Sequence, residues 1–366
     1  MRLVIFGLSL SSSWGNGHAT TYRGLLRGLR ALGHEVDFFE RDAAWYASHR
    51  DLPHSHDARL HLYSTWEAAR GAARAAARAA DAVIVGSYFP DGVALLDDLL
   101  ERPGAPRGPV LAFYDIDTPI TLDTLRRGTC AYLRADQIPG LDLYLSFTGG
   151  PVLEELARRW GARLVRPLYC ACDAEAYSTA RRPGKASAVL GFLGTYAPDR
   201  EGKLRRLLLE PARQMAQAQF EVAGSMYPDV GAWPANVRYT HHLPPSEHPR
   251  FYARSRFTLN LTRQAMVEAG YSPSVRLFEA AAAATPIVSD PWPGLDTFFE
   301  PGRDILIARD TAEMVAILEH TSDAEALALG RAAQQRTLEA HTGKHRAREL
   351  VAALETARCP ASITAN

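Results

Sequence analysis

Several features are scarce or missing in this sequence of 366 residues. Lys and Arg together number 41, as do Asp and Glu, so neither sign of charge is in excess. General nucleic-acid binding needs a basic surface that displaces counterions, and this balance argues against it, although a local basic cleft stays compatible with it. No apolar run approaches the ~20 residues needed to span a bilayer. We therefore expect no membrane span and no nucleic-acid partner.

Cysteine is rare as well. Four residues are too few for a disulfide framework in a chain of this length, and they are Cys130, Cys170, Cys172 and Cys359. The opening stretch "MRLVIFGLSLSSSWGNGH" lacks the basic region and the A-x-A site of a signal peptide. A first strand followed by a glycine loop explains this stretch better. Both observations favour a cytoplasmic protein.

Two common nucleotide-binding signatures and a firm metal signature are also missing. The loop after the first strand is not G-x-G-x-x-G, and no Walker lysine follows it, which disfavours nicotinamide binding and ATP hydrolysis. His54 and His56 lack a third ligand in their loop. Asp115 and Asp117 alone would make a thin metal site. We expect neither a bound metal nor a resident cofactor.

What the chain does contain is an alternation of apolar runs and helical patterns. The length suits two domains, and 47% apolar with 22% charged residues is typical of a soluble globular protein. Six apolar runs in each half, separated by helices, indicate parallel strands buried on both faces. The predicted fold is α/β, with two doubly wound Rossmann-like domains facing a central cleft. The predicted ranges are 1–172 for the first domain, 173–340 for the second, and 341–366 for a C-terminal helix and tail that could cross back to the first domain.

Ligands of open parallel sheets bind beyond the carboxyl ends of strands, so the loops there are the candidate sites. After the first strand, Gly15-Asn16-Gly17 lets the backbone approach a ligand, and His18 begins a helix. A purely structural turn is the alternative. After the fourth strand, "YDIDTP" places Asp115 and Asp117 at a strand end. A single Asp that caps a turn is the alternative there.

The second half brings cations and hydroxyls together. "GFLGTYAPDREGK" carries Thr195, Tyr196 and Arg200, and Arg263 follows another strand. In "SPSVRLFEAAAAATPIVSD", Ser272 is the predicted cap and Pro273 the first residue of a helix, with the Leu277 side in the core. Arg276 and Glu279 are then expected on its open side, where the alternative is an exposed ion pair worth only ~0.3 kcal/mol. Two arginines, hydroxyls and a helix N-terminus suit a diphosphate.

The sequence resembles the CgeB-like (spore maturation protein) family of bacterial glycosyltransferases, within the GT-B class. Motifs in consistent order over residues 9–300 carry the resemblance: "SSSWGNGHATTYRGLLRGL", "YDIDTP", "LSFTGGPVLEEL", "RPLYCACD", "GFLGTYAPDR" and "SPSVRLFEAAAAATPIVSD…GLDTFF". It implies transfer of a sugar from a nucleotide-diphosphate sugar, bound by the second domain, to an acceptor positioned by the first. It does not identify the base, the sugar or the acceptor.

The resemblance also assigns roles to residues. Glu279 matches the glutamate that binds the ribose hydroxyls in GT-B enzymes. The candidates for the diphosphate and the rest of the donor are Arg276, Ser274, Arg263, Arg200, Thr195 and Tyr196. Asp117 and His18 are the candidate catalytic bases of the first domain, and Gly15, Asn16, Gly17 and Asp115 the supporting acceptor-side residues. Metal is not expected to be obligatory.

One motif departs from the pattern of retaining GT-B enzymes. These often carry E-x7-E, and the position eight residues before Glu279 is Tyr271, with Glu268 as the nearest acid. Retention or inversion therefore stays open. So do two other functions: a nucleotide-sugar epimerase or hydrolase on the same scaffold, and a GT-B-like binding protein without turnover.

Overall fold

The computed structural model describes residues 1–15, 17–101, 108–178 and 186–359 of the chain. These residues form two compact units, one from the described residues up to 170 together with 343–359, and one from the described residues between 171 and 342. The C-terminal helix thus belongs to the first unit. The corresponding predicted ranges were 1–172, 341–366 and 173–340. In the described residues no helix is both long enough and apolar enough to cross a membrane.

The first unit is built on a parallel sheet of seven strands in the order β3-β2-β1-β4-β5-β6-β7. The strands are β1 (Arg2–Phe6), β2 (Glu35–Arg41), β3 (Arg59–Tyr63), β4 (Ala82–Gly86), β5 (Val110–Asp115), β6 (Leu143–Ser146) and β7 (Val165–Pro167). In β1 every residue after Arg2 is fully buried, as expected for a strand covered on both faces. Ile5 lies between Phe38 of β2 and Ile84 of β4.

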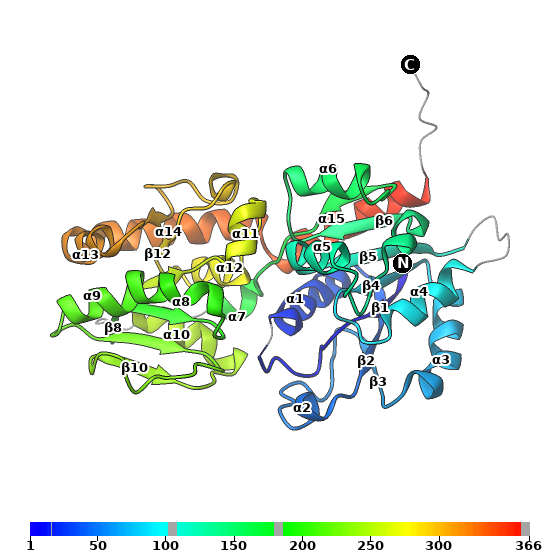
Figure 1. The fold of residues 1–366 in the computed structure, drawn as a ribbon, viewed down its shortest axis with the longest axis horizontal. Helices are drawn as coiled ribbons and strands as arrows, with labels where there is room; N and C mark the ends of the chain where they lie inside the picture. Colours follow the sequence, from blue (N-terminus) through cyan, green and yellow to red (C-terminus); the bar gives the residue numbers. More distant parts are fainter. Residues whose placement is uncertain (16, 102–107, 179–185, 360–366) are drawn as a thin grey trace, which may run out of the picture. The chain divides into compact units, whose positions relative to one another are not determined.

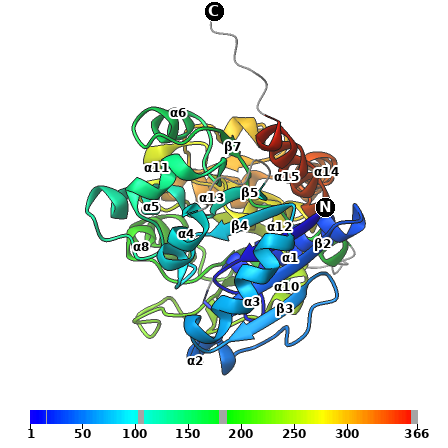
Figure 2. The ribbon, with the colours of Figure 1, turned by 90° about the vertical axis from the view of Figure 1, so that its right-hand side faces the viewer.

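Helices flank this sheet on both faces. They are α1 (His18–Ala31), α2 (Ala44–Ala47), α3 (Trp66–Ala79), α4 (Gly92–Leu100), α5 (Thr118–Arg126), the 3₁₀ helix η1 (Ala135–Gly140), α6 (Pro151–Arg158) and α15 (Gly343–Arg358). Figure 2 shows α4, α5 and α6 on one side of the sheet and α1 and α15 on the other. The last helix packs along α1, where Gly28 and Gly343 leave no room for side chains. Close contact of the two backbones holds the C-terminal helix on this unit.

The second unit has a parallel sheet of six strands in the order β10-β9-β8-β11-β12-β13 (Figure 1). The strands are β8 (Ala188–Leu193), β9 (Phe220–Ala223), β10 (Val237–Thr240), β11 (Ser255–Asn260), β12 (Ile287–Ser289) and β13 (Leu306–Ile307). Its core gathers apolar side chains of β8, β9 and β11 with those of the helix that follows β8, among them Phe192, Leu208, Val222 and Phe257.

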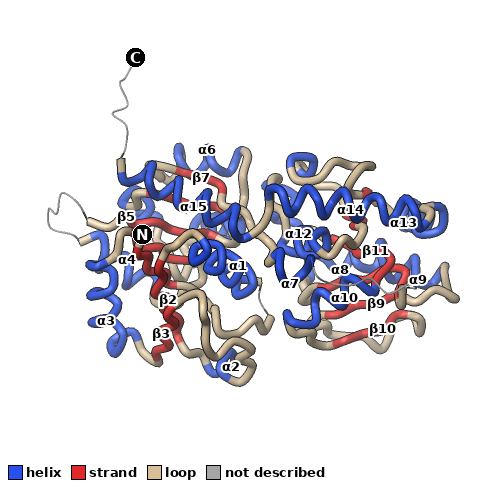
Figure 3. Tube along the Cα trace, turned by 180° about the vertical axis from the view of Figure 1, so that it is seen from behind, coloured by secondary structure: helices blue, strands red, loops and turns tan. Residues whose placement is uncertain are grey.

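The helical segments of the second unit connect and cover these strands. They are α7 (Ala174–Ser178), α8 (Pro198–Leu204), the π-helical turn η2 (Arg205–Leu209), α9 (Glu210–Gln214), η3 (Pro245–Glu247), α10 (His248–Arg254), α11 (Gln264–Ala269), α12 (Val275–Ala282), η4 (Leu295–Thr297), α13 (Thr311–His320) and α14 (Asp323–Ala340). Helix α12 packs against α14, which Figure 3 shows beside it. Gly330 of α14 meets the carbonyl of Ala284, so a small residue permits this approach.

The fold confirms the predicted class and all twelve predicted strands, but the sequence analysis missed β3. This strand lies at the sheet edge, and its sequence "RLHLY" is partly exposed throughout. Because Arg59 and His61 interrupt the apolar pattern, the rule for strands buried on both faces did not detect it.

The predicted start of α12 was wrong by two residues. The helix begins at Val275, and Ser274 is its N-cap residue in place of Ser272. Ser274 does not cap through its side chain, because its hydroxyl donates to Asn260. The prediction of an open helix face was also wrong: Arg276 and Glu279 are 7% and 4% exposed, and Ala280 and Ala283 are buried too. Helices α7, α10 and α14 cover the sides that periodicity alone left open.

Candidate functional site

The second unit changes its strand order between β8 and β11. These neighbours pair in parallel, and β9 and β12 extend the sheet in opposite directions from them. At such a switch point the loops leaving two adjacent strands diverge, and the carboxyl ends of the strands become a binding place. Here those ends are Leu193 and Asn260.

Arg276 reaches this point from α12. Its Nε donates to the carbonyl of Leu193, and its Nη1 donates to Oδ1 of Asn260 at 3.1 Å. The guanidinium lies over the Phe192 ring, 4.8 Å from the centroid. Arg276 therefore bridges the ends of β8 and β11 through a carbonyl, an amide oxygen and an aromatic face. These three partners carry no charge, and the carboxylates of Glu279 and Asp290 act on the guanidinium only through space.

Two hydroxyl residues set the orientation of Asn260. Ser274 donates to Oδ1 of Asn260 at 2.9 Å, and Nδ2 of Asn260 donates to the Ser289 hydroxyl at 2.9 Å. The Asn260 side chain thus presents its oxygen to Arg276. This arrangement connects the predicted donor residues Ser274 and Arg276 directly.

Arg200 adds a second positive charge. It lies in α8, half-buried, and its Nη2 donates to the carbonyl of Thr195. Burial, together with the charges of Arg276 and Arg263, lowers the pKa of Arg200 to about 10. Burial likewise lowers the pKa of Arg276. The structure has thus gathered like charges where water screens them poorly, an arrangement that favours an anion.

The remaining predicted donor residues surround this cluster. Tyr196 donates to Glu201 at 2.8 Å, and Arg263 pairs with Asp199 at 3.6 Å. The hydroxyl of Tyr227 donates to the Gly194 carbonyl at 3.0 Å, in the same loop as Thr195. Residues lining a small recess here include Thr195, Tyr196, Arg200 and Tyr227.

The sequence analysis missed Lys203. Its Nζ donates to Asp290 and to the carbonyl of Thr262, both at 2.7 Å. Asp290 accepts in turn from the amide and the hydroxyl of Thr262, each at 3.0 Å. This ion pair ties the loops after β11 and β12 to α8. A signal was available in the sequence, since Lys203 stands one turn after Arg200 on the same helix.

Glu279 lies one turn after Arg276 in α12, enclosed by aromatic residues. The Tyr252 hydroxyl donates to its Oε2 at 3.2 Å. Nδ1 of His248 lies 3.9 Å from Oε2 and shares a hydrogen bond with the Tyr177 hydroxyl of α7 at 3.3 Å. A hydroxyl donor therefore already occupies the carboxylate that the resemblance assigns to ribose hydroxyls. None of these three neighbours was predicted.

In the first unit, the two predicted catalytic residues share a neighbour. Tyr88 follows β4 with a φ of 62°, a strained value for tyrosine, and its hydroxyl donates to Oδ2 of Asp117 at 2.9 Å. The ring of His18 stands edge-on to Tyr88, with centroids 5.3 Å apart. Burial lowers the pKa of His18 to about 4, so its imidazole is neutral at pH 7. Asp117 is half-buried and precedes the first turn of α5.

Asp115 lies beneath Asp117 and is completely buried. It accepts from Tyr144 at 2.6 Å, from Thr121 at 2.7 Å and from the Asp117 amide at 3.3 Å. Burial raises its pKa to about 6 in spite of these bonds. Asp115 therefore supports the turn that carries Asp117.

The glycine loop lies at the switch point of the first sheet, between β1 and β4. Gly15 has a φ of 68°, which favours glycine, and Gly17 precedes α1 as its N-cap residue. Asn16 lies outside the described residues. Among the described residues no group of three or more His, Cys, Asp or Glu could hold a metal ion.

Comparison with known proteins places this geometry in a class. Residues 200–352 match the model of a family described as glycosyl transferase-like. The search among curated proteins found no match. Solved structures match across almost the whole chain. Sucrose-phosphate synthase from Thermosynechococcus elongatus is 14% identical, with a TM-score of 0.69 over 97% of this chain and 98% of that one.

Two further structures were solved with donor molecules. An alpha-glucosyltransferase in complex with UDP-glucose and DNA is 14% identical, with a TM-score of 0.72 over 97% of this chain and 99% of that chain. Anabaena Alr3699/HepE in complex with UDP and glucose is 12% identical, with a TM-score of 0.66 over 97% and 100%. The chain therefore has the GT-B fold. Fold and family model together support the predicted glycosyltransferase function with a nucleotide-sugar donor.

Proposed function

We propose that this protein transfers a sugar from a uridine-diphosphate sugar to a hydroxyl group of an acceptor, with the donor bound by the second unit. The family match, residues 200–352, lies in that unit up to residue 342 and continues into α15 of the first unit. UDP or UDP-glucose is present in several structures of the same fold. The finer assignment to CgeB-like bacterial enzymes rests on the sequence motifs.

The observation that carries the proposal is the cation cluster at the switch point. Arg276 and Arg200 are partly or fully removed from water; burial lowers the pKa of both, and the charge of Arg276 also lowers that of Arg200. A diphosphate would neutralise both charges and accept hydrogen bonds from guanidinium groups. Arg263, Ser274, Thr195 and Tyr196 complete the proposed contacts to the donor.

Glu279 is proposed to bind the ribose. It stands one helical turn beyond Arg276, and it accepts from the hydroxyl of Tyr252. Ribose offers hydroxyl donors of the same kind, so the donor would replace or join this tyrosine at the carboxylate. The spacing of Arg276 and Glu279 on one helix suits a diphosphate followed by its ribose.

Asp117 is proposed as the catalytic base and His18 as the residue to test next. In this reaction the Asp117 carboxylate takes the proton of the acceptor hydroxyl, and the acceptor oxygen bonds to the anomeric carbon. The bond from that carbon to the diphosphate oxygen breaks, and UDP leaves with the electron pair. The arginine cluster stabilises the leaving charge. The hydrogen bond from the Tyr88 hydroxyl holds the orientation of the Asp117 carboxylate. The proposed reaction requires neither a metal nor a resident cofactor.

The proposal also covers the kind of acceptor and the cellular location. A net charge of zero supports an acceptor other than nucleic acid. Because neighbours of this fold act on DNA, duplex DNA is one arm of the test. Free cysteines, two of them buried, support a cytoplasmic location.

The test begins with thermal shifts of the native protein against UDP-, GDP-, ADP- and TDP-glucose, where the UDP sugar should raise the midpoint most. The products formed from UDP-glucose, with water, free sugars or duplex DNA as acceptor, are then analysed. Transfer of glucose to a sugar or to DNA supports a transferase, whereas UDP release with water alone would indicate a hydrolase. An altered free nucleotide sugar would indicate an epimerase, and binding without conversion a non-catalytic protein.

A matched pair of arginine variants controls the test. Arg276→Met should abolish the thermal shift with UDP. Arg256→Met should leave it intact, because Arg256 of β11 bonds instead to Asp323 and to the carbonyls of Leu318 and Thr321. Equal shifts in both variants would contradict the proposed donor site.

A further inference from the structure

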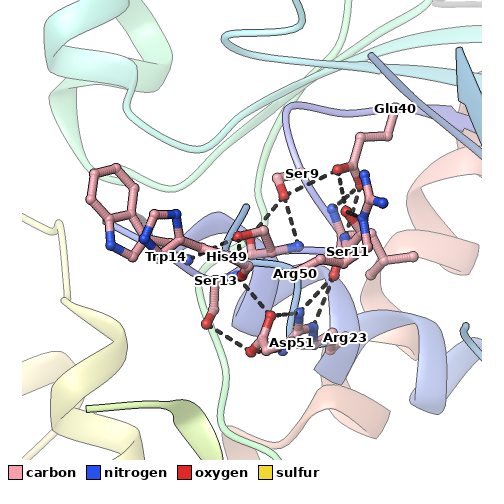
Figure 4. A network of polar contacts seen from close by, with 11 residues as sticks. Ser9, Ser11, Ser13, Trp14, Arg23, Glu40, His49, Arg50 and Asp51 are labelled. Carbon is pink, nitrogen blue, oxygen red and sulfur yellow. Dashed lines mark hydrogen bonds and ion pairs between the residues drawn. The ribbon is translucent and has the colours of Figure 1, made fainter. Parts of the chain in front are cut away.

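The segment between β1 and α1 holds a serine-rich loop, residues 9–13, that is bound to a buried carboxylate (Figure 4). Oε2 of Glu40 accepts from the amides of Leu10 at 2.6 Å and Ser11 at 2.9 Å. Oε1 accepts from the hydroxyls of Ser11 at 2.6 Å and Ser9 at 3.4 Å. Glu40 is only 1% exposed. All four of these donors belong to the loop.

A second carboxylate holds the other end of the loop. Asp51 accepts from the amide of Ser13 at 3.0 Å and from its hydroxyl at 2.8 Å. Arg23 of α1 binds both oxygens of Asp51 and also donates twice to the carbonyl of Leu10. Figure 4 shows Ser9 and Ser11 turned toward Glu40, and Ser13 turned toward Asp51. The loop is therefore fixed from two sides by side chains of β2, α1 and the segment after α2.

Burying a carboxylate in this way is expensive unless several donors compensate it. Main-chain N–H groups of a buried loop need acceptors, but a carbonyl group or a water molecule could accept from them at a lower desolvation cost than a buried carboxylate. The loop also has a special location, at the switch point between β1 and β4. At its end Trp14 stacks on His49, with ring centroids 4.7 Å apart, and four residues later His18 begins α1.

We propose that Glu40 is a positioning residue of the transfer reaction, which holds the loop of residues 9–13 so that the start of α1 keeps His18 against Tyr88, the residue that bonds Asp117. This inference rests on the proposed function. Glu40 touches neither donor nor acceptor in this account. It acts by restricting the loop before substrates bind, because a pre-formed acceptor side needs no ordering during the reaction.

The experiment compares Glu40→Leu with Asp37→Leu. Asp37 is a buried carboxylate of the same strand, but it binds Arg59 and His61 at the sheet edge instead of the loop. Both variants should lose thermal stability. In Glu40→Leu alone, hydrogen exchange at the amides of Leu10 and Ser11 should rise by about ten-fold or more. UDP release from UDP-glucose should fall by about ten-fold or more, with Kd for UDP within about two-fold of native.

A conservative variant keeps the test decisive if Glu40→Leu does not fold. Glu40→Gln retains one acceptor oxygen for the two loop amides, so slow exchange and most of the turnover should return. Asp37→Leu should change neither the exchange at Leu10 and Ser11 nor the turnover by more than about two-fold.

Three results would overturn the inference. Faster hydrogen exchange in the loop of Glu40→Leu together with native turnover would show that the bonds between Glu40 and the loop are purely structural. Equal losses of turnover in Glu40→Leu and Asp37→Leu would indicate general destabilisation. Unchanged exchange would show that Glu40 does not hold the loop. If the native protein neither binds UDP nor consumes UDP-glucose, the proposed function fails and the positioning role with it, whereas the exchange data still decide whether Glu40 holds the loop.

Discussion

Replacing Arg200 by methionine should weaken donor binding without weakening the fold. The pKa of Arg200 is lowered to about 10 by burial and by the charges of Arg276 and Arg263. A base with a lower pKa in the folded state binds its proton less tightly there than in the unfolded state. At every pH below about 10 the charged side chain therefore destabilises the fold in full, and this cost decreases only as the pH rises from about 10 toward the higher pKa of the unfolded state.

The size of the cost follows from the pKa. An unperturbed arginine has a pKa above 12, and each tenfold change in proton affinity is worth about 1.4 kcal/mol, which gives an upper limit of ~3 kcal/mol. Arg200 is half-buried, so solvent screening reduces this to ~1–2 kcal/mol. The variant also loses the hydrogen bond to the Thr195 carbonyl, which lowers its free energy of unfolding by ~1 kcal/mol. The free energy of unfolding of Arg200→Met should stay level or rise by up to ~1 kcal/mol, and Tm by up to ~4 °C.

The affinity of Arg200→Met for the donor should fall, whereas its stability stays level or rises. A charge-assisted bond to a diphosphate is worth ~1.5–3 kcal/mol, so Kd for UDP should rise by about ten-fold or more. Urea unfolding and UDP titration at pH 7 measure the two effects separately. Arg256→Met is the control, which should lose stability and retain UDP affinity because its bonds are internal to the second unit. A lower Tm for Arg200→Met together with an unchanged Kd would refute the account of the cation cluster.

Three further outcomes are expected from carboxylate variants. Glu279→Gln should raise Kd for UDP by about ten-fold, because charge-assisted acceptance of ribose hydroxyls is lost. The control Tyr252→Phe removes only an internal donor and should leave Kd within about two-fold. Titration calorimetry with UDP measures both values. Asp117→Asn should lower turnover of UDP-glucose by about 100-fold with native UDP affinity, and near-native turnover would remove Asp117 from the chemistry. Asp115 has a pKa raised to about 6, so its stabilising contribution is complete below the unfolded value near 4 and is lost as the pH rises through 6. Urea unfolding should therefore show the native protein more stable than Asp115→Asn at pH 4.5. This difference in the free energy of unfolding should shrink by pH 8.

The sequence was sufficient for the architecture because parallel strands buried on both faces leave a strong local trace. In "RLVIFGL" and "AVLGFLG", uninterrupted apolar residues reflect helices above and below the sheet, so strand position follows from composition over a few residues. The edge strand Arg59–Tyr63 lacks that cover, and its mixed residues gave no such trace. Motif order then indicated a GT-B glycosyltransferase, which the fold and the family model support.

The sequence also indicated which segments carry polar groups, but it did not determine which groups meet. Helical periodicity placed Arg276 and Glu279 on an open face, yet α7, α10 and α14 cover α12 from several sides and bury both. Periodicity describes one helix, whereas burial depends on neighbours that can be far apart in the chain. Leu193, for example, lies more than 80 residues before Arg276, whose guanidinium binds its carbonyl.

The loop after β1 shows the same difference between what the sequence indicates and what the fold decides. By itself the sequence determined that a loop rich in glycine and serine follows the first strand, since turn-forming residues act through their own backbone. Only the tertiary structure decided that β2 lies beside β1, so that a glutamate about 30 residues away meets the amides of Leu10 and Ser11. Hydrogen bonds of that kind act over less than 4 Å, and chain folding alone brings distant residues within this range.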